Sequence, residues 1–342
     1  MLAIITGVAG PALSDAERGF LREAQPWGLI IFQRNVAGAD ALRRLIDDCR
    51  TVLGRDAPVL VDQEGGRVQR LNPPHWPKYP PAADYGRLYR LDRTGGLAAA
   101  RLGGRLIAAD LARVGIDIDC MPVADLPIAG ADAVIGDRAF AMEPDAVAAL
   151  AAAFAQGLVD GGVLPVLKHI PGHGRATADS HQRLPVVTAE RSILEASDFA
   201  AFRKLADLPL AMTAHVVFAA IDPIAPATTS PAIVRDVIRG SIGYRGLLMS
   251  DDLSMGALSG SLAERTRAAL AAGCDVALHC NGNMGEMLAV AAAASPLCGE
   301  AAARAAGALA AKRPPVPIDL AAKRGEFAAL MGTLREPARG GA

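Results

Sequence analysis

Aromatic residues are scarce in this sequence. Phe, Trp and Tyr together make up 4% of the 342 residues, although hydrophobic residues make up 51%. Alanine takes the place of larger apolar side chains, which suits many helices packed on a sheet. The chain can still bury a substantial core, because a domain of this size removes about 75% of its extended-chain surface from water.

Cysteine is also rare, and its spacing is irregular. The chain has five: Cys49, Cys120, Cys274, Cys280 and Cys298. An odd number with no short repeated spacing excludes a disulfide framework and a zinc ribbon, and it is typical of a reducing compartment. We therefore expect a cytoplasmic protein.

Neither sign of charge is in excess, and no long apolar run occurs. The chain has 35 Lys and Arg against 36 Asp and Glu, so it offers no electrostatic footprint for nucleic acid or an anionic membrane. No apolar stretch approaches the roughly 18 residues that a membrane helix needs. The apolar residues 1–10 lack the flanks of a signal peptide, and we interpret them as the first strand. The expected partner is small and polar.

Short strand-like runs alternate with longer Ala/Leu-rich stretches along the whole chain. The eight predicted strands comprise residues 2–6, 29–32, 59–61, 116–121, 164–167, 210–213, 246–249 and 276–278. The predicted helices comprise residues 14–24, 39–53, 97–114, 145–160, 191–205, 231–238, 262–271 and 284–294. This alternation predicts an α/β fold, a single (β/α)8 TIM-type barrel over residues 1–342 with a helical extension from about residue 300. A doubly wound sheet is the alternative.

Polar residues follow the ends of several predicted strands. They are Asp62, Lys168, His169, His215, Asp251, Asp252, His279 and Asn281. Because the carboxyl ends of all the strands of a parallel barrel open on one face, these residues are expected to converge on a single site.

The segment from Lys168 to His181 has the composition of a catalytic loop. It contains three of the six histidines, and its proline and two glycines prevent a helix. Asp179 and His181 are two residues apart, a spacing at which a carboxylate can stabilise the imidazolium of a general acid. The alternative interpretation is a solvated loop histidine.

Two further pairs have two interpretations each. Asp62 and Arg70 flank a Gly-Gly loop, where they either hydrogen-bond a polyhydroxylated ligand or brace the loop against itself. Of Asp251 and Asp252, one is a candidate nucleophile, or the pair caps the following helix.

Neither a metal nor an organic cofactor is predicted. His169, His173 and His181 are four and eight residues apart, but Pro171 and Gly172 remove the helix that would align them as ligands. The Gly-Gly loop is not a dinucleotide fingerprint either, because the G-x-G-x-x-G pattern is absent after the strand.

Five segments, taken together and in order, resemble one family. They are residues 28–32 (GLIIF), 61–70 (VDQEGGRVQR), 135–140 (IGDRAF), 168–174 (KHIPGHG) with 179–181 (DSH), and 249–255 (MSDDLSM). These segments resemble the bacterial β-N-acetylhexosaminidases of glycoside hydrolase family 3, of the type that acts in cell-wall recycling. Two mild departures are Ala139, where relatives often have Ser, and Ile170, where Phe is common.

The resemblance implies roles for individual residues. Asp251 would be the nucleophile, and His181, supported by Asp179, would be the acid/base. The implied substrate contacts are Asp62, Arg70, Arg138, Lys168 and His169.

The implied activity is that of a retaining exo-β-N-acetylglucosaminidase. It would remove terminal N-acetylglucosamine from peptidoglycan-derived GlcNAc-1,6-anhydroMurNAc peptides through a covalent glycosyl-enzyme. Alternatives are a glycoside phosphorylase using the same site, a Schiff-base aldolase using Lys168, and a sugar-binding barrel without catalysis. The expected partner is a sugar or muropeptide, not nucleic acid or membrane, and the oligomeric state is left open.

Overall fold

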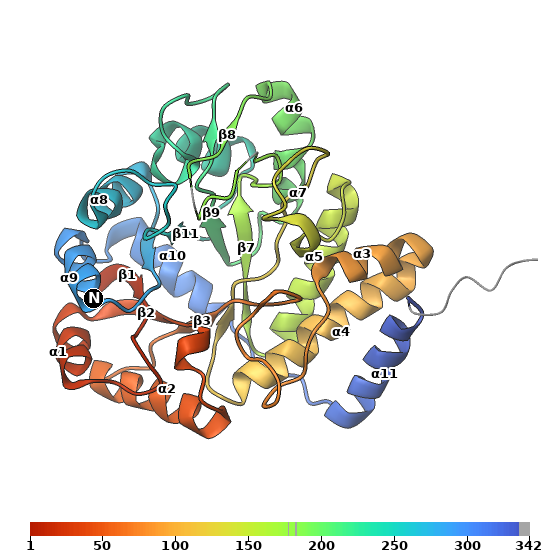
Figure 1. Ribbon diagram of the computed structural model, residues 1–342, viewed down its shortest axis with the longest axis horizontal. Helices are drawn as coiled ribbons and strands as arrows, with labels where there is room; N and C mark the ends of the chain where they lie inside the picture. Colours follow the sequence, from red (N-terminus) through yellow and green to blue (C-terminus); the bar gives the residue numbers. More distant parts are fainter. Residues whose placement is uncertain (177, 182, 335–342) are drawn as a thin grey trace, which may run out of the picture.

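Eight parallel strands form a closed barrel at the centre of the molecule (Figure 1). The computed structural model describes residues 1–176, 178–181 and 183–334. The barrel strands are β1 (Leu2–Thr6), β2 (Pro26–Ile31), β3 (Val59–Val61), β6 (Ile118–Asp119), β7 (Leu164–Ile170), β9 (Leu210–Thr213), β11 (Leu247–Asp252) and β12 (Val276–His279). Their order is β1-β12-β11-β9-β7-β6-β3-β2, and β1 pairs with β2 to close the ring. The predicted (β/α)8 barrel is confirmed, and the doubly wound alternative is wrong because the sheet closes on itself.

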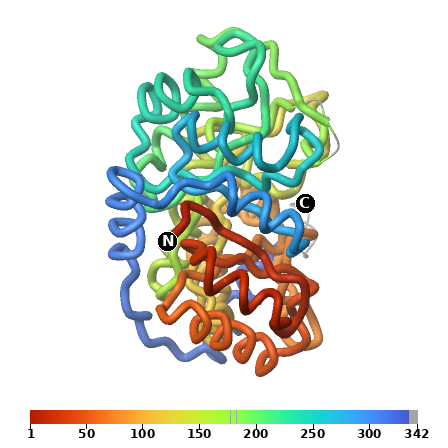
Figure 2. Tube along the Cα trace, turned by 90° about the vertical axis from the view of Figure 1, so that its left-hand side faces the viewer, coloured from red at the N-terminus to blue at the C-terminus, as the bar shows by residue number. Residues whose placement is uncertain are grey.

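The strand sequences are runs of apolar residues because both faces of each strand are buried. All six residues of β2 are buried, as are all seven of β7. One set of side chains, including Trp27, Leu60 and Met249, fills the barrel interior, and a larger cluster lies between the strands and the helices. Figure 2 shows how closure brings the N-terminal strand beside the segment that contains β12, with which it pairs.

Helices follow the strands and cover the outside of the barrel. They are α1 (Asp15–Ala24), α2 (Ala39–Leu53), α3 (Ala82–Leu91), α4 (Arg93–Ala112), α5 (Pro144–Asp160), α6 (Arg191–Ala196), α7 (Asp198–Lys204), the π-helix η4 (Ile233–Ser241), α8 (Leu262–Ala272) and α9 (Met284–Ala293), with short 3-10 turns η1 (Gln33–Asn35), η2 (Gly136–Arg138) and η3 (Ala227–Thr229). At the start of α1, Ser14 accepts from the Glu17 amide while the Glu17 carboxylate accepts from the Ser14 amide. The sequence pattern at Ser14 predicts this capping box.

Some predicted boundaries are wrong. The sequence does not predict α3, and residues 191–205 form two helices that meet at Ser197 rather than one. Two small sheets are also additional, β4 (Gln63–Gly65) with β5 (Val68–Gln69) and β8 (Val186–Val187) with β10 (Val217–Phe218). The strands β7 and β11 run three residues further than expected, so Lys168, His169 and Asp251 lie on strand ends rather than in the loops beyond them.

Two helices follow the last barrel unit, α10 (Gly299–Ala310) and α11 (Leu320–Gly332). The helix α11 packs on α4 and α3 (Figure 1), and Arg324 on α11 donates to the buried carboxylate of Asp110 on α4 at 2.7 Å. No helix in the described part of the chain has the length and apolarity needed to cross a membrane.

Candidate active site

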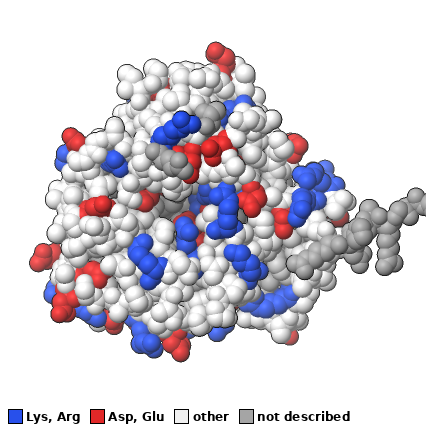
Figure 3. All heavy atoms as spheres, viewed as in Figure 1, with Lys and Arg blue, Asp and Glu red and all other residues white. Residues whose placement is uncertain are grey.

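A cavity of about 410 Å³ opens at the carboxyl ends of the strands. Figure 3 shows it as a hollow at the centre of this face, with basic and acidic side chains gathered around it. Its volume is in the range of small-molecule sites. The titratable side chains that line it are Asp62, Glu64, Arg67, Arg138, Lys168, His169, His173, Asp179, His181, Asp251, Asp252 and Cys280.

One wall of the cavity is a cluster of ion pairs around the buried Lys168. The Lys168 Nζ lies 2.9 Å from Asp62 Oδ1 and 2.6 Å from Glu64 Oε1. Arg138 donates to both oxygens of Glu64 at 2.8 Å, in a bidentate pair. An ammonium has three donors, so Lys168 keeps one for a ligand while two hold the carboxylates.

The cluster is ionised. Burial by itself raises the pKa of Glu64, but Arg138 and Lys168 outweigh it and set the pKa at about 2. Burial lowers the pKa of Lys168, yet Asp62 and Glu64 reverse the effect and leave the pKa above its ordinary value. A lysine held protonated is a poor nucleophile, which argues against the aldolase alternative.

Arg70 supports the cluster from outside. Its Nη2 lies 2.8 Å from Asp62 Oδ2, and its guanidinium lies 4.8 Å from the centre of the Phe32 ring. Arg70 is not among the residues that line the cavity, whereas Asp62 and Phe32 are. Arg70 therefore braces Asp62, which also faces the cavity, and a contact of Arg70 with the substrate stays a prediction.

A buried carboxylate fixes the orientation of His169. The Asp125 Oδ2 lies 2.7 Å from His169 Nδ1, and Asp125 Oδ1 accepts the backbone amide of His173 at 2.7 Å. Because a carboxylate only accepts, His169 donates through Nδ1 and presents Nε2 toward Arg138, 3.5 Å away. Burial lowers the pKa of His173 to about 4, so its imidazole is neutral, and its Nε2 contacts Ser180.

Asp251 lies at the end of β11, half-buried in the cavity wall. Its Oδ1 accepts the backbone amide of Asp252 at 2.8 Å. Burial by itself raises the pKa of Asp251, but the nearby histidines, the Asp252 amide and Lys168 outweigh it and bring the pKa below its ordinary value. Asp251 is thus a carboxylate, while the Asp252 carboxylate is occupied by Ser254 and the Cys280 amide.

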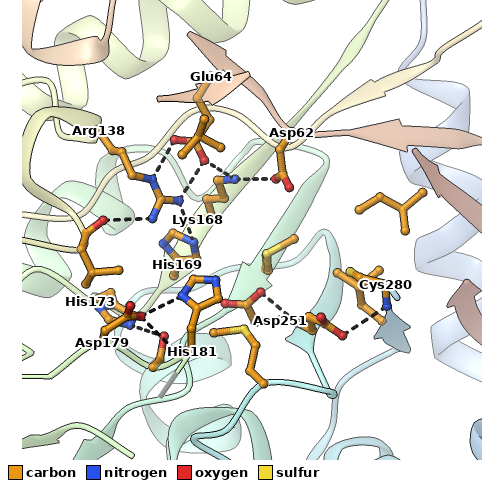
Figure 4. A pocket seen from close by; sticks show the side chains of 18 of the residues that line it. Asp62, Glu64, Arg138, Lys168, His169, His173, Asp179, His181, Asp251 and Cys280 are labelled. Atoms are coloured by element: carbon orange, nitrogen blue, oxygen red, sulfur yellow. Dashed lines mark hydrogen bonds and ion pairs between the residues drawn. The ribbon is translucent and has the colours of Figure 1, made fainter. Parts of the chain in front are cut away.

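The loop after β7 brings His181 to the same cavity. The His181 Nδ1 lies 2.7 Å from Asp179 Oδ1, as the spacing predicts, and 63% of the His181 side chain is exposed. Backbone bonds from Ala257 to Ser180 at 3.0 Å and from Gly256 to His181 at 3.3 Å dock this loop on the loop after β11. Figure 4 shows the imidazole of His181 and the carboxylate of Asp251 both directed into the cavity.

The sequence interpretation missed Glu64 and Asp125. Glu64 lies two residues after Asp62, and this spacing, which places alternate residues of an extended segment on one side, could have indicated it. Asp125 follows the fourth predicted strand, where a carboxylate fits the rule that located the other site residues. The pairing of Glu64 with Arg138 crosses 74 positions and has no signal in a single sequence.

Comparison with known proteins assigns the chain to a family. The model of the glycosyl hydrolase family 3 N-terminal domain matches residues 3–304. The chain belongs to glycosyl hydrolase family 3. Within the family, it is 42% identical over 282 residues to the beta-hexosaminidase of Alkalilimnicola ehrlichii, covering 81% of this chain and 80% of that protein. The corresponding enzyme of Aromatoleum aromaticum is 39% identical over 282 residues, covering 81% and 79% of the two chains.

A solved structure supports the same assignment. The chain matches NagZ from Neisseria gonorrhoeae, crystallised in complex with N-trifluoroacetyl-D-glucosamine, with a TM-score of 0.84 and 32% identity over 97% of this chain and 96% of that one. The resemblance to bacterial β-N-acetylhexosaminidases of family 3 is therefore confirmed.

Proposed function

We propose that this protein is a retaining exo-β-N-acetylglucosaminidase that takes peptidoglycan-derived fragments, GlcNAc-1,6-anhydroMurNAc peptides, as its substrates. The observation that carries the proposal is the placement of the Asp251 carboxylate and the Asp179–His181 pair on one cavity. Family membership and the beta-hexosaminidase relatives support the sugar class.

The ion-pair cluster holds the sugar in this proposal. Lys168 and Arg138 donate to hydroxyl or carbonyl oxygens, and Asp62 accepts from hydroxyl groups with the lone pairs that its two braces leave free. His169, oriented by Asp125, adds one further polar contact through Nε2. Both partners of each ion pair are already in place, so little reorganisation is needed on binding.

The first chemical step uses both catalytic groups. Asp251 attacks the anomeric carbon as the glycosidic C–O bond breaks, and protonated His181 transfers its Nε2 proton to the leaving oxygen. Asp179 accepts from Nδ1 throughout, which fixes the ring and leaves Nε2 for the reaction. The products of the step are the free aglycone, a glycosyl ester of Asp251 and a neutral imidazole.

The second step reverses these roles. Neutral His181 takes a proton from water, the water oxygen bonds to the anomeric carbon, and the carboxylate of Asp251 leaves. Two displacements at one carbon give net retention of configuration. Phosphate in place of water would make the enzyme a phosphorylase.

The test compares two aryl glycosides that share one leaving group. The protein should hydrolyse 4-nitrophenyl β-N-acetylglucosaminide far faster than 4-nitrophenyl β-glucoside, and NMR of the first product should show the β-anomer. Asp251→Asn, which keeps the shape of the side chain, should lower kcat by about 10³-fold or more in a protein that circular dichroism shows to be folded. An active Asp251→Asn enzyme would remove Asp251 from the mechanism, and a product that is N-acetylglucosamine 1-phosphate in phosphate buffer would favour the phosphorylase.

A further inference from the structure

The backbone that carries Asp251 lies where regular strand pairing ends. The register of β11 with β9 covers Leu247 to Met249, which pair with Leu210 to Met212. The strand continues to Asp252, and its register with β12 shifts between Met249 and Asp252. The main chain at the proposed nucleophile is therefore held by something other than a regular ladder.

Three buried side chains provide that support. The Asp251 amide lies 3.4 Å from Thr213 Oγ1, which lies 2.7 Å from Thr228 Oγ1. Thr228 Oγ1 is 2.7 Å from His215 Nδ1, and His215 Nε2 is 2.9 Å from the carbonyl oxygen of Asp252. The chain of contacts thus begins at the N–H of Asp251 and returns to the C=O of the next residue.

The donors and acceptors fix a direction along this chain. A carbonyl only accepts, so His215 carries a proton on Nε2. Burial lowers the pKa of His215, which makes the ring neutral and leaves Nδ1 as an acceptor for the Thr228 hydroxyl. The Ala214 carbonyl competes for that proton at the longer distance of 3.1 Å. Thr213 then donates to Thr228 and accepts from the Asp251 amide, so every group has a partner.

We propose that His215, Thr228 and Thr213 form a positioning clamp, which holds the peptide groups of Asp251 and Asp252 so that the Asp251 carboxylate faces the anomeric carbon in both displacement steps. The proposal rests on the function proposed above, in which Asp251 is the nucleophile. His215 and Thr228 are not among the cavity-lining residues, and neither is Thr213. They act through the backbone of Asp251 and are positioning residues, not catalytic ones.

The clamp predicts a specific kinetic effect. Thr228→Val keeps the shape of the side chain but removes the hydroxyl in the middle of the chain. It should lower kcat by about 10- to 100-fold, because displacement of a reacting group by about 1 Å costs up to about 100-fold. The inhibition constant of N-acetylglucosamine should change by less than about twofold, because the sugar-binding cluster is built from β7, η2 and the segment that follows β3. Thr228→Ser, which restores the hydroxyl, should recover kcat to within about threefold of the wild type.

A matched control separates the clamp from general stability. Thr266 on α8 is equally buried, its hydroxyl donates to the Leu262 carbonyl at 2.7 Å, and it is not among the residues that line the cavity. Thr266→Val removes the same group and should keep kcat within about twofold of the wild type. If Thr228→Val does not fold, Thr213→Val breaks the clamp at the end of β9 and should show the same loss of kcat.

Each outcome has one meaning. A wild-type kcat in Thr228→Val or Thr213→Val would overturn the clamp while leaving the proposed function intact. A loss of kcat accompanied by an equal loss of N-acetylglucosamine binding would also overturn it, because the whole cavity would then be deformed. A wild-type protein without activity on 4-nitrophenyl β-N-acetylglucosaminide would instead remove the proposed function, and the clamp with it.

Discussion

Glu64→Gln is expected to destabilise the protein strongly at neutral pH and weakly in acid. The Glu64 side chain is 3% exposed and accepts from Lys168 at 2.6 Å and twice from Arg138 at 2.8 Å. Glutamine keeps the shape but removes the charge. Lys168, Arg138 and Arg70 would then share the carboxylate of Asp62, and buried cations without a matching anion are costly.

The magnitude follows from the pKa of Glu64. Its value of about 2 lies below the ordinary 4.5, and at about 1.4 kcal/mol per unit the ionised form contributes about 3 kcal/mol to the free energy of unfolding. Removing one partner of a buried ion pair costs about 3–5 kcal/mol, which agrees.

The sign of the pH dependence follows from the direction of the shift. A carboxyl group whose pKa is depressed in the folded state stabilises the protein above its unfolded pKa. That stabilisation is lost as the pH falls from 4.5 toward 2, where the folded protein takes up the proton. The difference between wild type and Glu64→Gln should therefore shrink from about 3 kcal/mol at pH 7 to about 1 kcal/mol at pH 3.

Urea denaturation followed by circular dichroism at these two pH values measures the difference. Glu195→Gln is the control, because Glu195 forms an exposed pair with Arg191 on the surface; it should change the free energy of unfolding by less than about 0.5 kcal/mol at both pH values. A difference for Glu64→Gln that is equally large at pH 7 and pH 3, or absent at pH 7, would refute the reasoning.

Three further predictions concern the cavity. His181→Ala should slow a substrate with a poor leaving group by at least about 100-fold more than a 2,4-dinitrophenyl glycoside, which leaves without protonation, and equal losses in steady-state assays would contradict the acid role. Asp125→Asn weakens the bond that orients His169 and should raise KM about tenfold with a smaller effect on kcat; an unchanged KM would show that the orientation is not needed. A Cβ on Gly174 would lie 1.9 Å from the Leu126 carbonyl oxygen. Gly174→Ala should therefore displace the loop that carries His181 and lower kcat about tenfold. Full activity of this variant would show that the position of the loop does not limit the reaction.

The barrel could be predicted because its strands are buried on both faces. Such strands are uninterrupted apolar runs, and all eight were located within a few residues. The sequence places the ends of β7 and β11 too early, because polar residues continue these strands. Lys168 and Asp252 interrupt the apolar pattern, yet both remain in strands because the cavity supplies partners for their side chains.

The site could be located but not assembled from the sequence. The rule that functional groups follow barrel strands indicated Asp62, Lys168 and Asp251, which all line one cavity. The bonds between these groups depend on tertiary placement. The contact of Lys168 with Asp62 spans 106 positions, and nothing in the local pattern distinguishes a brace such as Arg70 from a residue that lines the cavity.

In the proposed mechanism, the charges of the cavity favour a histidine in the acid/base position. When Asp251 leaves the sugar in the second step of that mechanism, it regains a negative charge beside a wall that contains Asp62 and Glu64, balanced by Lys168 and Arg138. A carboxylate acting as base would carry a further negative charge before it takes the proton, and this charge would oppose the one that develops on Asp251. Neutral His181 adds none before it takes the proton, and it is positively charged once it has done so. The departing carboxylate and the new imidazolium then attract one another, and the site returns to the charge state in which it began.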